Sequence, residues 1–155
     1  MLVRRAIKAD IPAINCLLRQ VLDVHHQGRP DLFKGGVKKY SDAQLEVILS
    51  AEDTPVFVAE TDGQVYGYAF CCLQQISGHN VLQDVKTLDI DDLCVDESVR
   101  GKKIGSILFD YVKQFAKEHG CYNLTLNVWA CNPSAAKFYE KMGMQPQKTY
   151  LESIL

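Results

Sequence analysis

The chain has 155 residues, of which 47% are hydrophobic and 23% are charged, with a formal net charge of −2 at pH 7. This is the composition of a folded globular protein, so it excludes a disordered chain and predicts one domain over residues 1–155. The small net charge gives no electrostatic reason to expect nucleic acid or an anionic membrane as a partner.

The N-terminal part predicts a short strand followed by two helices. Residues 2–7 are expected to form the strand, and residues 11–26 an amphipathic helix with Asp10 as its N-cap. A Gly-Arg-Pro-Asp sequence ends this helix and opens a loop over residues 28–40. The second helix is expected over residues 41–50, beginning at a serine cap.

Three strands are expected in the middle of the chain. The first two, residues 55–60 and 65–73, are joined by the Asp-Gly turn of a hairpin at residues 61–64. Residues 74–84 are polar and are predicted to form a loop. The third strand spans residues 87–95.

The C-terminal part predicts two more helices and two more strands. A helix over residues 104–119 ends at Gly120, and residues 122–129 alternate as in a strand. A helix over residues 133–142 follows, and residues 147–154 form a possible last strand. The element order β-α-α-β-β-β-α-β-α-β predicts a mixed α/β sheet covered by helices.

The cysteines and histidines show no metal-ligand spacing, so no metal site is expected. The absence of CxxC pairs favours reduced, mostly buried thiols. No apolar stretch reaches the roughly 18 residues that a membrane-spanning helix needs, and we expect a soluble cytoplasmic protein. The six cysteines are Cys16, Cys71, Cys72, Cys94, Cys121 and Cys131.

A basic, glycine-containing segment lies between the strand at 87–95 and the helix that follows it. Its sequence is Arg100-Gly101-Lys102-Lys103-Ile104-Gly105. Backbone N–H groups and the positive end of a helix dipole bind phosphate at such a place. The segment fits neither the P-loop nor the Rossmann pattern. Taken alone, it is also compatible with a solvated basic turn.

A second segment, Asn132-Pro133-Ser134-Ala135-Ala136-Lys137-Phe138-Tyr139, follows the strand at 122–129. Asn132 and Tyr139 are separated by about two helical turns, so both can face the same direction. Alternatively, Asn132 is only a helix cap and Tyr139 only packs against the sheet. Two such segments, each after a core strand, together favour an acyl-CoA-dependent transferase.

These segments resemble the GNAT superfamily of N-acetyltransferases. The motif match covers about residues 88–144, and the element order fits nearly the whole chain. The resemblance implies a single acetyltransferase domain whose mixed, mostly antiparallel sheet is flanked by helices. It also implies direct acetyl transfer from acetyl-CoA to a primary amine of a small molecule or peptide, without a covalent enzyme intermediate.

The resemblance also implies roles for individual residues. Tyr139 protonates the departing thiolate, which a neutral phenol with an ordinary pKa near 10 can do. The strand backbone pairs with the pantetheine arm, the basic loop binds the pyrophosphate, and an asparagine contacts the cofactor. The cofactor-binding residues implied are Leu93, Cys94, Val95, Arg100, Gly101, Lys102, Lys103, Ile104, Gly105, Ser106 and Asn132.

Lys103 departs from the family signature Arg-x-x-Gly-x-Gly/Ala, because it stands at the first of the two glycines. Glycine matters where φ is positive or where the anion presses on Cα. We expect an ordinary negative φ at this position, in which case lysine costs little and adds a charge near the phosphates. With a positive φ, CoA binding would suffer.

The acceptor amine needs a base, since it is protonated at neutral pH. The resemblance implies this role for an acidic residue at Asp91, while Asp92 and Phe33 are expected to contact the substrate. Strand alternation predicts that Asp91 and Asp92 lie on opposite faces of the sheet, so that at most one of them faces the acceptor. These acids could instead bind a cationic substrate or be solvated, and Phe33 could simply anchor a surface loop.

Two alternatives stay open. The chain could be a catalytically weak CoA-binding regulatory module, since Lys103 stands in the pyrophosphate loop, or it could transfer a longer acyl group. The sequence does not identify the acceptor. A homodimer is possible.

Overall fold

The computed structural model describes residues 1–155, and its five strands form one sheet in the order β1-β2-β3-β4-β5. The first four strands run antiparallel, and β5 is parallel to β4. The predicted mixed, mostly antiparallel sheet is therefore confirmed. The strands are β1 (Leu2–Arg5), β2 (Val56–Thr61), β3 (Gln64–Gln75), β4 (Lys86–Val95) and β5 (Asn123–Leu126).

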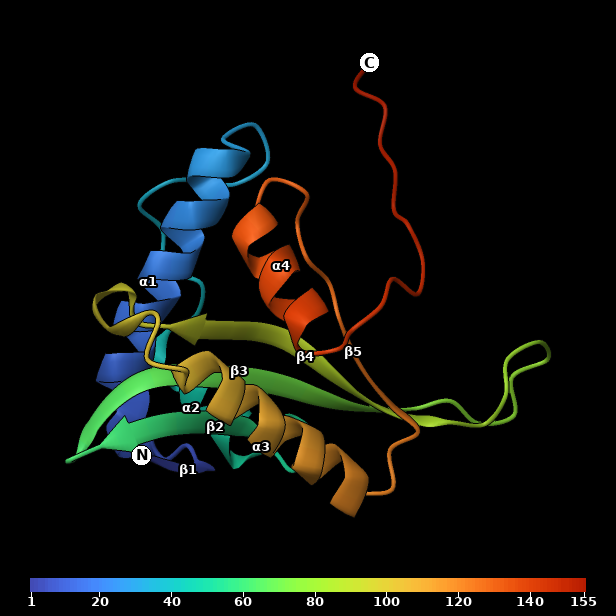
Figure 1. Cartoon of the computed structure of the whole chain (residues 1–155), viewed down its shortest axis with the longest axis horizontal. Coiled ribbons are helices and arrows are strands. Elements are labelled where there is room, and N and C mark those ends of the chain that lie inside the picture. Colours follow the sequence, from blue (N-terminus) through green and yellow to red (C-terminus); the bar gives the residue numbers. More distant parts are fainter.

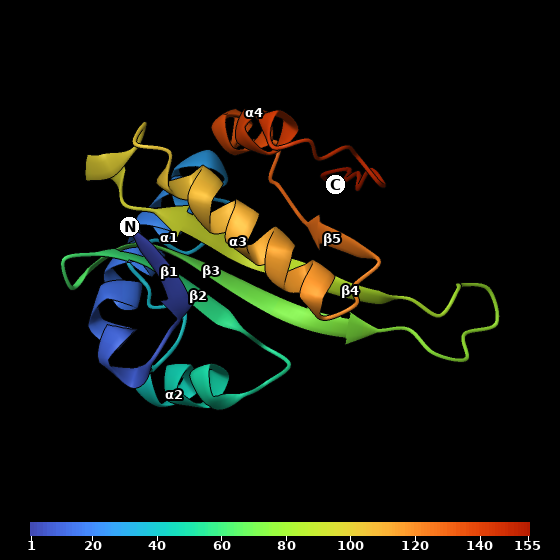
Figure 2. The ribbon, with the colours of Figure 1, turned by 60° about the horizontal axis from the view of Figure 1, so that its bottom comes forward.

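Four helices cover the sheet, as the sequence predicted. The helices α1 and α2 lie on one face, and α3 crosses the other face (Figure 2). Short 3₁₀ turns precede α1 and α3. The helices are α1 (Ile11–Gly28), α2 (Asp42–Ser50), α3 (Ile104–Glu118) and α4 (Pro133–Lys141), and the turns are η1 (Lys8–Asp10) and η2 (Glu97–Val99).

The sheet separates two hydrophobic layers of similar size. Residues such as Ile14 and Leu45 pack from α1 and α2 onto Tyr68 and Phe70 of β3. On the opposite face, Leu108 and other apolar residues of α3 pack onto β2, β3 and β4, and α4 packs at the margin of this layer. Both faces of the central strands are thus buried, which fixes the register of β3 against β4.

The N-termini of α1 and α2 differ in their side-chain capping. Ser41 caps α2, since its hydroxyl accepts from Gln44 N–H at 3.2 Å while the Gln44 side chain accepts from Ser41 N–H. Asp10 precedes α1 but makes no capping hydrogen bond. Its carboxylate instead pairs with Arg4 at 2.7 Å and accepts from the N–H of Ile7. Asp10 therefore occupies the N-cap position of α1, as expected, but its side chain does not cap the helix.

The C-terminal strands differ from the prediction. The strand expected over 122–129 pairs with β4 only over Asn123–Leu126. The strand expected over 147–154 is absent, because this segment has no neighbouring strand with which to exchange hydrogen bonds. Figure 1 shows the segment in red, leading away from the sheet, and Tyr150, Leu151 and Ile154 on it are exposed.

All six cysteines are free. The expectation that most of them are buried is wrong, because only Cys71 and Cys94 are fully buried and Cys16 is exposed. No group of three or more His, Cys, Asp or Glu side chains is arranged to hold a metal ion. None of the helices has both the length and the apolar composition needed to cross a membrane.

Candidate active site

The two sequence motifs lie against each other in the folded chain. A Cβ atom placed on Gly105, in the first turn of α3, would lie 3.4 Å from the ring of Phe138 on α4. The rings of Phe138 and Tyr139 both pack near Phe109 of α3, with centroids 6.3 and 6.2 Å away. The fold thus brings the basic loop and the tyrosine helix to one end of the sheet.

The start of α3 presents unpaired N–H groups. The first intrahelical hydrogen bond runs from Ile107 N–H to the carbonyl of Lys103 at 3.0 Å, so the N–H groups of residues 103–106 have no acceptor in the chain. The side chains of Arg100, Lys102 and Lys103 are exposed around them. Free donors, a helix N-terminus and three cations suit a diphosphate.

Lys103 has a left-handed backbone, with φ +64° and ψ 11°. The expectation of an ordinary negative φ is therefore wrong. The chain leaves η2, turns through Gly101 at φ +85°, and needs a second left-handed residue to enter α3. The lysine keeps the conformation that a glycine would adopt easily, at a cost of roughly 1–2 kcal/mol for a residue with a side chain.

The edge of β4 beside this loop is free. Pairing between β4 and β5 ends at Ile90 and Leu126, whereas β4 continues to Val95. The N–H of Asp96 donates to the carbonyl of Tyr66 on the β3 side. By alternation, the peptide groups of Leu93 and Val95 point to the other side, where no strand pairs with them. An extended chain could add to this edge.

A β-bulge at Asp91 shifts the alternation of side chains between the two faces of β4. Phe70 on β3 lies opposite Asp92, and the next residue, Cys71, lies opposite Ile90, so Asp91 is extra. Ile90 and Leu93 consequently both pack on the α3 face, three residues apart. Strand alternation does not hold across the bulge. The expectation that it separates Asp91 from Asp92 onto opposite faces is therefore wrong.

One ammonium contacts both aspartates. Nζ of Lys39, from the loop before α2, lies 3.1 Å from Oδ2 of Asp91 and 3.6 Å from Oδ2 of Asp92. The Asp91 side chain is 55% exposed, while that of Asp92 is 10% exposed and accepts a hydrogen bond from the hydroxyl of Tyr68 at 2.9 Å. We call Lys39, Tyr68, Asp91 and Asp92 the carboxylate cluster.

Burial and charge shift the pKa values in this cluster. Burial raises the pKa of the Asp92 carboxyl, and the nearby Lys39 ammonium opposes this only in part. Burial by itself lowers the pKa of Lys39, but Asp92 and Asp91 outweigh it and hold that pKa above its usual value. The cluster therefore contains a protonated amine beside a carboxylate of increased basicity.

Aromatic side chains line the neighbourhood of this cluster. The ring of Phe33 lies 5.0 Å from that of His25 on α1 and packs edge-on against Trp129 at 4.9 Å. Burial lowers the pKa of His25, and the charges of Asp92 and Lys39 act on it as well. Phe33 thus belongs to an aromatic group near the acids, and its contact with a substrate stays a prediction.

The Tyr139 phenol and the Cys94 thiol both have raised pKa values, with different consequences for catalysis. Burial raises the pKa of the half-buried Tyr139, with smaller contributions from Asp92 and Cys94, so its phenol holds its proton at neutral pH. The Cys94 thiol donates to the carbonyl of Leu17 at 3.6 Å on the α1 face, and burial raises its pKa to about 12. A thiol of this kind is a poor nucleophile.

Asn132 caps α4, because its Oδ1 accepts from the N–H of Ala135 at 3.2 Å. This fixes the start of the helix that carries Tyr139. The capping role was one of the two interpretations of Asn132 from sequence. Its contact with a cofactor stays a prediction.

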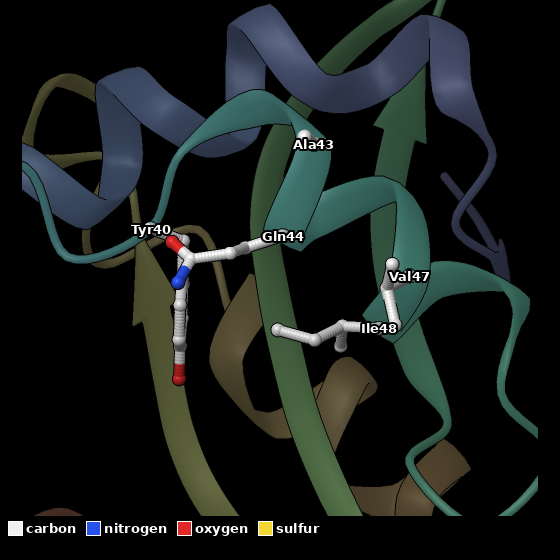
Figure 3. A pocket seen from close by; sticks show the side chains of 5 residues that line it. All are labelled: Tyr40, Ala43, Gln44, Val47 and Ile48. Atoms are coloured by element: carbon white, nitrogen blue, oxygen red, sulfur yellow. The ribbon is translucent and has the colours of Figure 1, made fainter.

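A shallow groove of about 410 Å³ lies along α2, beside the loop that carries Lys39. Figure 3 shows the Tyr40 ring, Gln44 and Ile48 along it. The groove is mostly apolar and contains no carboxylate. It lacks the carboxylates and the ammonium of the carboxylate cluster.

Four side chains near the site were not expected from sequence. Lys39 is 52 residues from Asp91, and Tyr68 is 24 residues from Asp92. No local sequence pattern predicts either contact. His25 is one of the four histidines that lack metal-ligand spacing, and no other pattern in the sequence indicates a role for it. Trp129 is the single tryptophan of the chain and the last residue of the strand predicted over 122–129, which is the one signal that could have identified it.

Comparison with known proteins gives one family. Residues 21–144 match the model of the acetyltransferase (GNAT) family. An uncharacterized N-acetyltransferase of Methanocaldococcus jannaschii is 25% identical over 111 residues, which are 72% of this chain and 48% of that protein. The chain thus spans about half the length of this curated relative.

Solved structures share the fold. The crystal structure of a mutant BH1408 protein from Bacillus halodurans has a TM-score of 0.96 and 29% identity, covering 100% of this chain and 99% of that one. An aminoglycoside N-acetyltransferase in complex with CoA has a TM-score of 0.73 and 17% identity, covering 99% of this chain and 98% of the other. At that identity the second likeness shows the fold alone.

Proposed function

Since the chain belongs to the GNAT family of acetyltransferases, we propose that it moves an acetyl group from acetyl-CoA directly to a primary amine of a small molecule or peptide. The observation that carries this proposal is the free edge of β4, which ends beside the unpaired N–H groups of residues 103–106. The extended pantetheine arm would bind along the free edge of β4, and the diphosphate would bind at the unpaired N–H groups.

The donor would bind along β4 and the start of α3. Its arm would pair with the free peptide groups of Leu93 and Val95, as an added strand does. Its pyrophosphate would accept hydrogen bonds from residues 103–106, with Arg100 and Lys102 nearby. An N–H of this edge, such as that of Leu93, would polarise the thioester carbonyl. A structural relative is described in complex with CoA, which supports this donor class.

The acceptor would meet the carboxylate cluster. Its ammonium must lose a proton before the nitrogen attacks the carbonyl carbon. Asp91 and Asp92 are the two candidate bases, and the geometry favours Asp92, which is more buried and is held by Tyr68. Asp91, half exposed and closer to Lys39, would then bind the charged acceptor.

Tyr139 would act as the acid. As the carbon–sulfur bond breaks, its phenol would donate a proton to the CoA thiolate, and the amide nitrogen would release the proton that restores the phenol. The raised pKa of Tyr139 keeps this proton in place until the thiolate forms. The inert Cys94 thiol supports direct transfer over an acyl-enzyme.

The cluster supports a cationic acceptor. Two carboxylates that already hold an ammonium suit an amine that arrives protonated, and the rings of Phe33 and Trp129 could cover an apolar or sugar-like body. A structural relative is an aminoglycoside N-acetyltransferase, which fits the same description.

The experiment that tests the function is a mass-spectrometric screen. The full chain and acetyl-CoA are incubated with a mixed library of small amines, polyamines, aminoglycosides and peptides, and thiol release is followed in parallel. Acetylated products with matching thiol release support the proposal. Binding of acetyl-CoA without any product favours the CoA-binding module, and products only with longer acyl-CoA donors favour the second alternative.

We also propose that the protein forms a homodimer and is located in the cytoplasm. The outer edge of β5 is unpaired, and exposed apolar residues such as Leu151 and Ile154 follow α4. Both could be covered by a second copy. Six free cysteines suit a reducing compartment. Light scattering at several protein concentrations would test the dimer.

A further inference from the structure

The ammonium of Lys39 occupies the position expected of an acceptor amine. It lies 3.1 Å from the Asp91 carboxylate and 3.6 Å from that of Asp92, the two candidate bases beside the free edge of β4. A substrate ammonium entering the site would meet the same oxygens. The chain therefore presents one of its own primary amines where it would bind a foreign one.

The fold holds this amine in place. The Lys39 side chain is only 29% exposed, and its Nζ lies 5.3 Å from the centre of the Tyr40 ring. The preceding residue behaves differently. Lys38 is 53% exposed and pairs with Asp42 at the start of α2, outside the cluster. Two adjacent lysines are thus directed to different surroundings.

We propose that the protein acetylates its own Lys39. The inference rests on the proposed function and uses the same groups. Nζ of Lys39 gives one proton to Asp92 and attacks the thioester carbonyl carbon of acetyl-CoA. The new carbon–nitrogen bond forms as the carbon–sulfur bond breaks, and the CoA thiolate takes the proton of Tyr139. The second proton leaving the nitrogen restores the phenol, and the proton on Asp92 passes to solvent.

The product is Nε-acetyl-lysine at position 39, with free CoA. The amide is neutral, so it no longer pairs with Asp91 and Asp92. Acetylation would thereby remove a cation that competes with the acceptor for these two carboxylates. A protein acetylated at Lys39 would bind a cationic acceptor more tightly than the unmodified form.

The test measures the two neighbouring lysines in one molecule. The full chain is incubated with isotope-labelled acetyl-CoA and no amine, and is then digested with chymotrypsin to release residues 34–40. Fragment spectra separate label on Lys39 from label on Lys38. Catalysed transfer should label Lys39 at least about a hundredfold faster, the scale of positioned acid–base catalysis, while chemical acetylation would favour the exposed Lys38.

Variants make the result specific. Asp92→Asn and Tyr139→Phe should each slow labelling of Lys39 at least tenfold without changing that of Lys38, provided that melting temperature and CoA binding are retained. Lys39→Arg should abolish the fast label, and Lys38→Arg should leave it unchanged. Equal labelling of both lysines, or labelling of Lys39 that is unaffected by Asp92→Asn, overturns the inference.

The outcome also separates this inference from the proposed function. If library amines are acetylated while Lys39 stays unlabelled, the self-acetylation is wrong and the proposed function stands. If CoA binds but neither Lys39 nor any amine is acetylated, both are wrong. Rapid labelling of Lys39 supports the inference even where no library amine reacts.

Discussion

The hydroxyl of Tyr68 on β3 donates a 2.9 Å hydrogen bond to Oδ2 of Asp92 on β4. The same oxygen lies 3.6 Å from the ammonium of Lys39. Burial favours the neutral form of Asp92, whereas the phenol and the ammonium favour its charged form. The basicity of Asp92 therefore depends on a balance that single substitutions can shift.

Tyr68→Phe should move the acid limb of the pH–activity profile to higher pH. The variant removes a hydrogen bond that stabilises the Asp92 carboxylate, so the pKa of Asp92 should rise further and more base should be protonated at a given pH. The measurement is kcat/KM against pH with a reactive amine. Tyr66→Phe is the matched control, because its hydroxyl contacts only the exposed Gln64. Superimposed Tyr68→Phe and wild-type profiles would contradict the proposed role of Asp92.

Asp92→Asn should alter stability in a pH-dependent way. Because the folded protein raises the pKa of Asp92, folding favours the protonated form. That contribution is fully present below the unfolded pKa of about 3.9 and is lost as pH rises through the folded pKa. Relative to wild type, the variant should therefore gain melting temperature between acid and neutral pH. A difference in melting temperature that is constant from acid to neutral pH would show that the pKa of Asp92 is not raised.

Tyr139→Phe should lower turnover by roughly ten- to a thousandfold, the scale of one acid–base contribution, with CoA affinity little changed. The raised pKa of Tyr139 also means that ionisation of its phenol should cause no loss of activity below about pH 10. Steady-state kinetics and CoA titration measure both. Wild-type turnover in the variant would refute the acid role.

Lys103→Gly should stabilise the protein by about 1 kcal/mol or less. Glycine relieves the left-handed strain of φ +64°, which costs roughly 1–2 kcal/mol, although its greater unfolded-state entropy offsets part of the gain. The melting temperature should rise by about 2–4 °C at most. Lys102→Gly is the control, since it removes a neighbouring cation without relieving a positive φ. Equal effects of the two variants would show that strain at Lys103 is negligible.

Gly105→Asp should weaken CoA binding sharply, because it places a carboxylate in the first turn of α3 beside the proposed pyrophosphate site. Gly105→Ala separates charge from packing. Its Cβ would make the same 3.4 Å contact with Phe138 but carries no charge. Calorimetric titration with CoA compares the two. If alanine weakens binding as much as aspartate, the loss comes from displacement of Phe138 and not from charge repulsion.

Much of the fold could be predicted from local patterns. Apolar periodicity, a serine cap, a first-turn proline and helix-ending glycines together predicted all four helices. The Asp-Gly turn predicted the hairpin of β2 and β3, where Asp62 and Gly63 have the positive φ that such a turn requires. The basic loop and the Asn132–Tyr139 segment identified the family. These features are local, since each depends on residues a few positions apart, and so the sequence alone determined them.

The tertiary structure decided what depends on distant partners. The bulge at Asp91 lets β4 pair with β3 while Ile90 and Leu93 both face α3, and only the pairing with β3 shows which residue is extra. The segment at 147–154 forms no strand because no neighbour pairs with it. Lys39 meets Asp91 and Asp92 only through the fold of the loop before α2. The sequence thus determined most of the helices and strands and the basic loop, whereas the carboxylate cluster arises from long-range contacts.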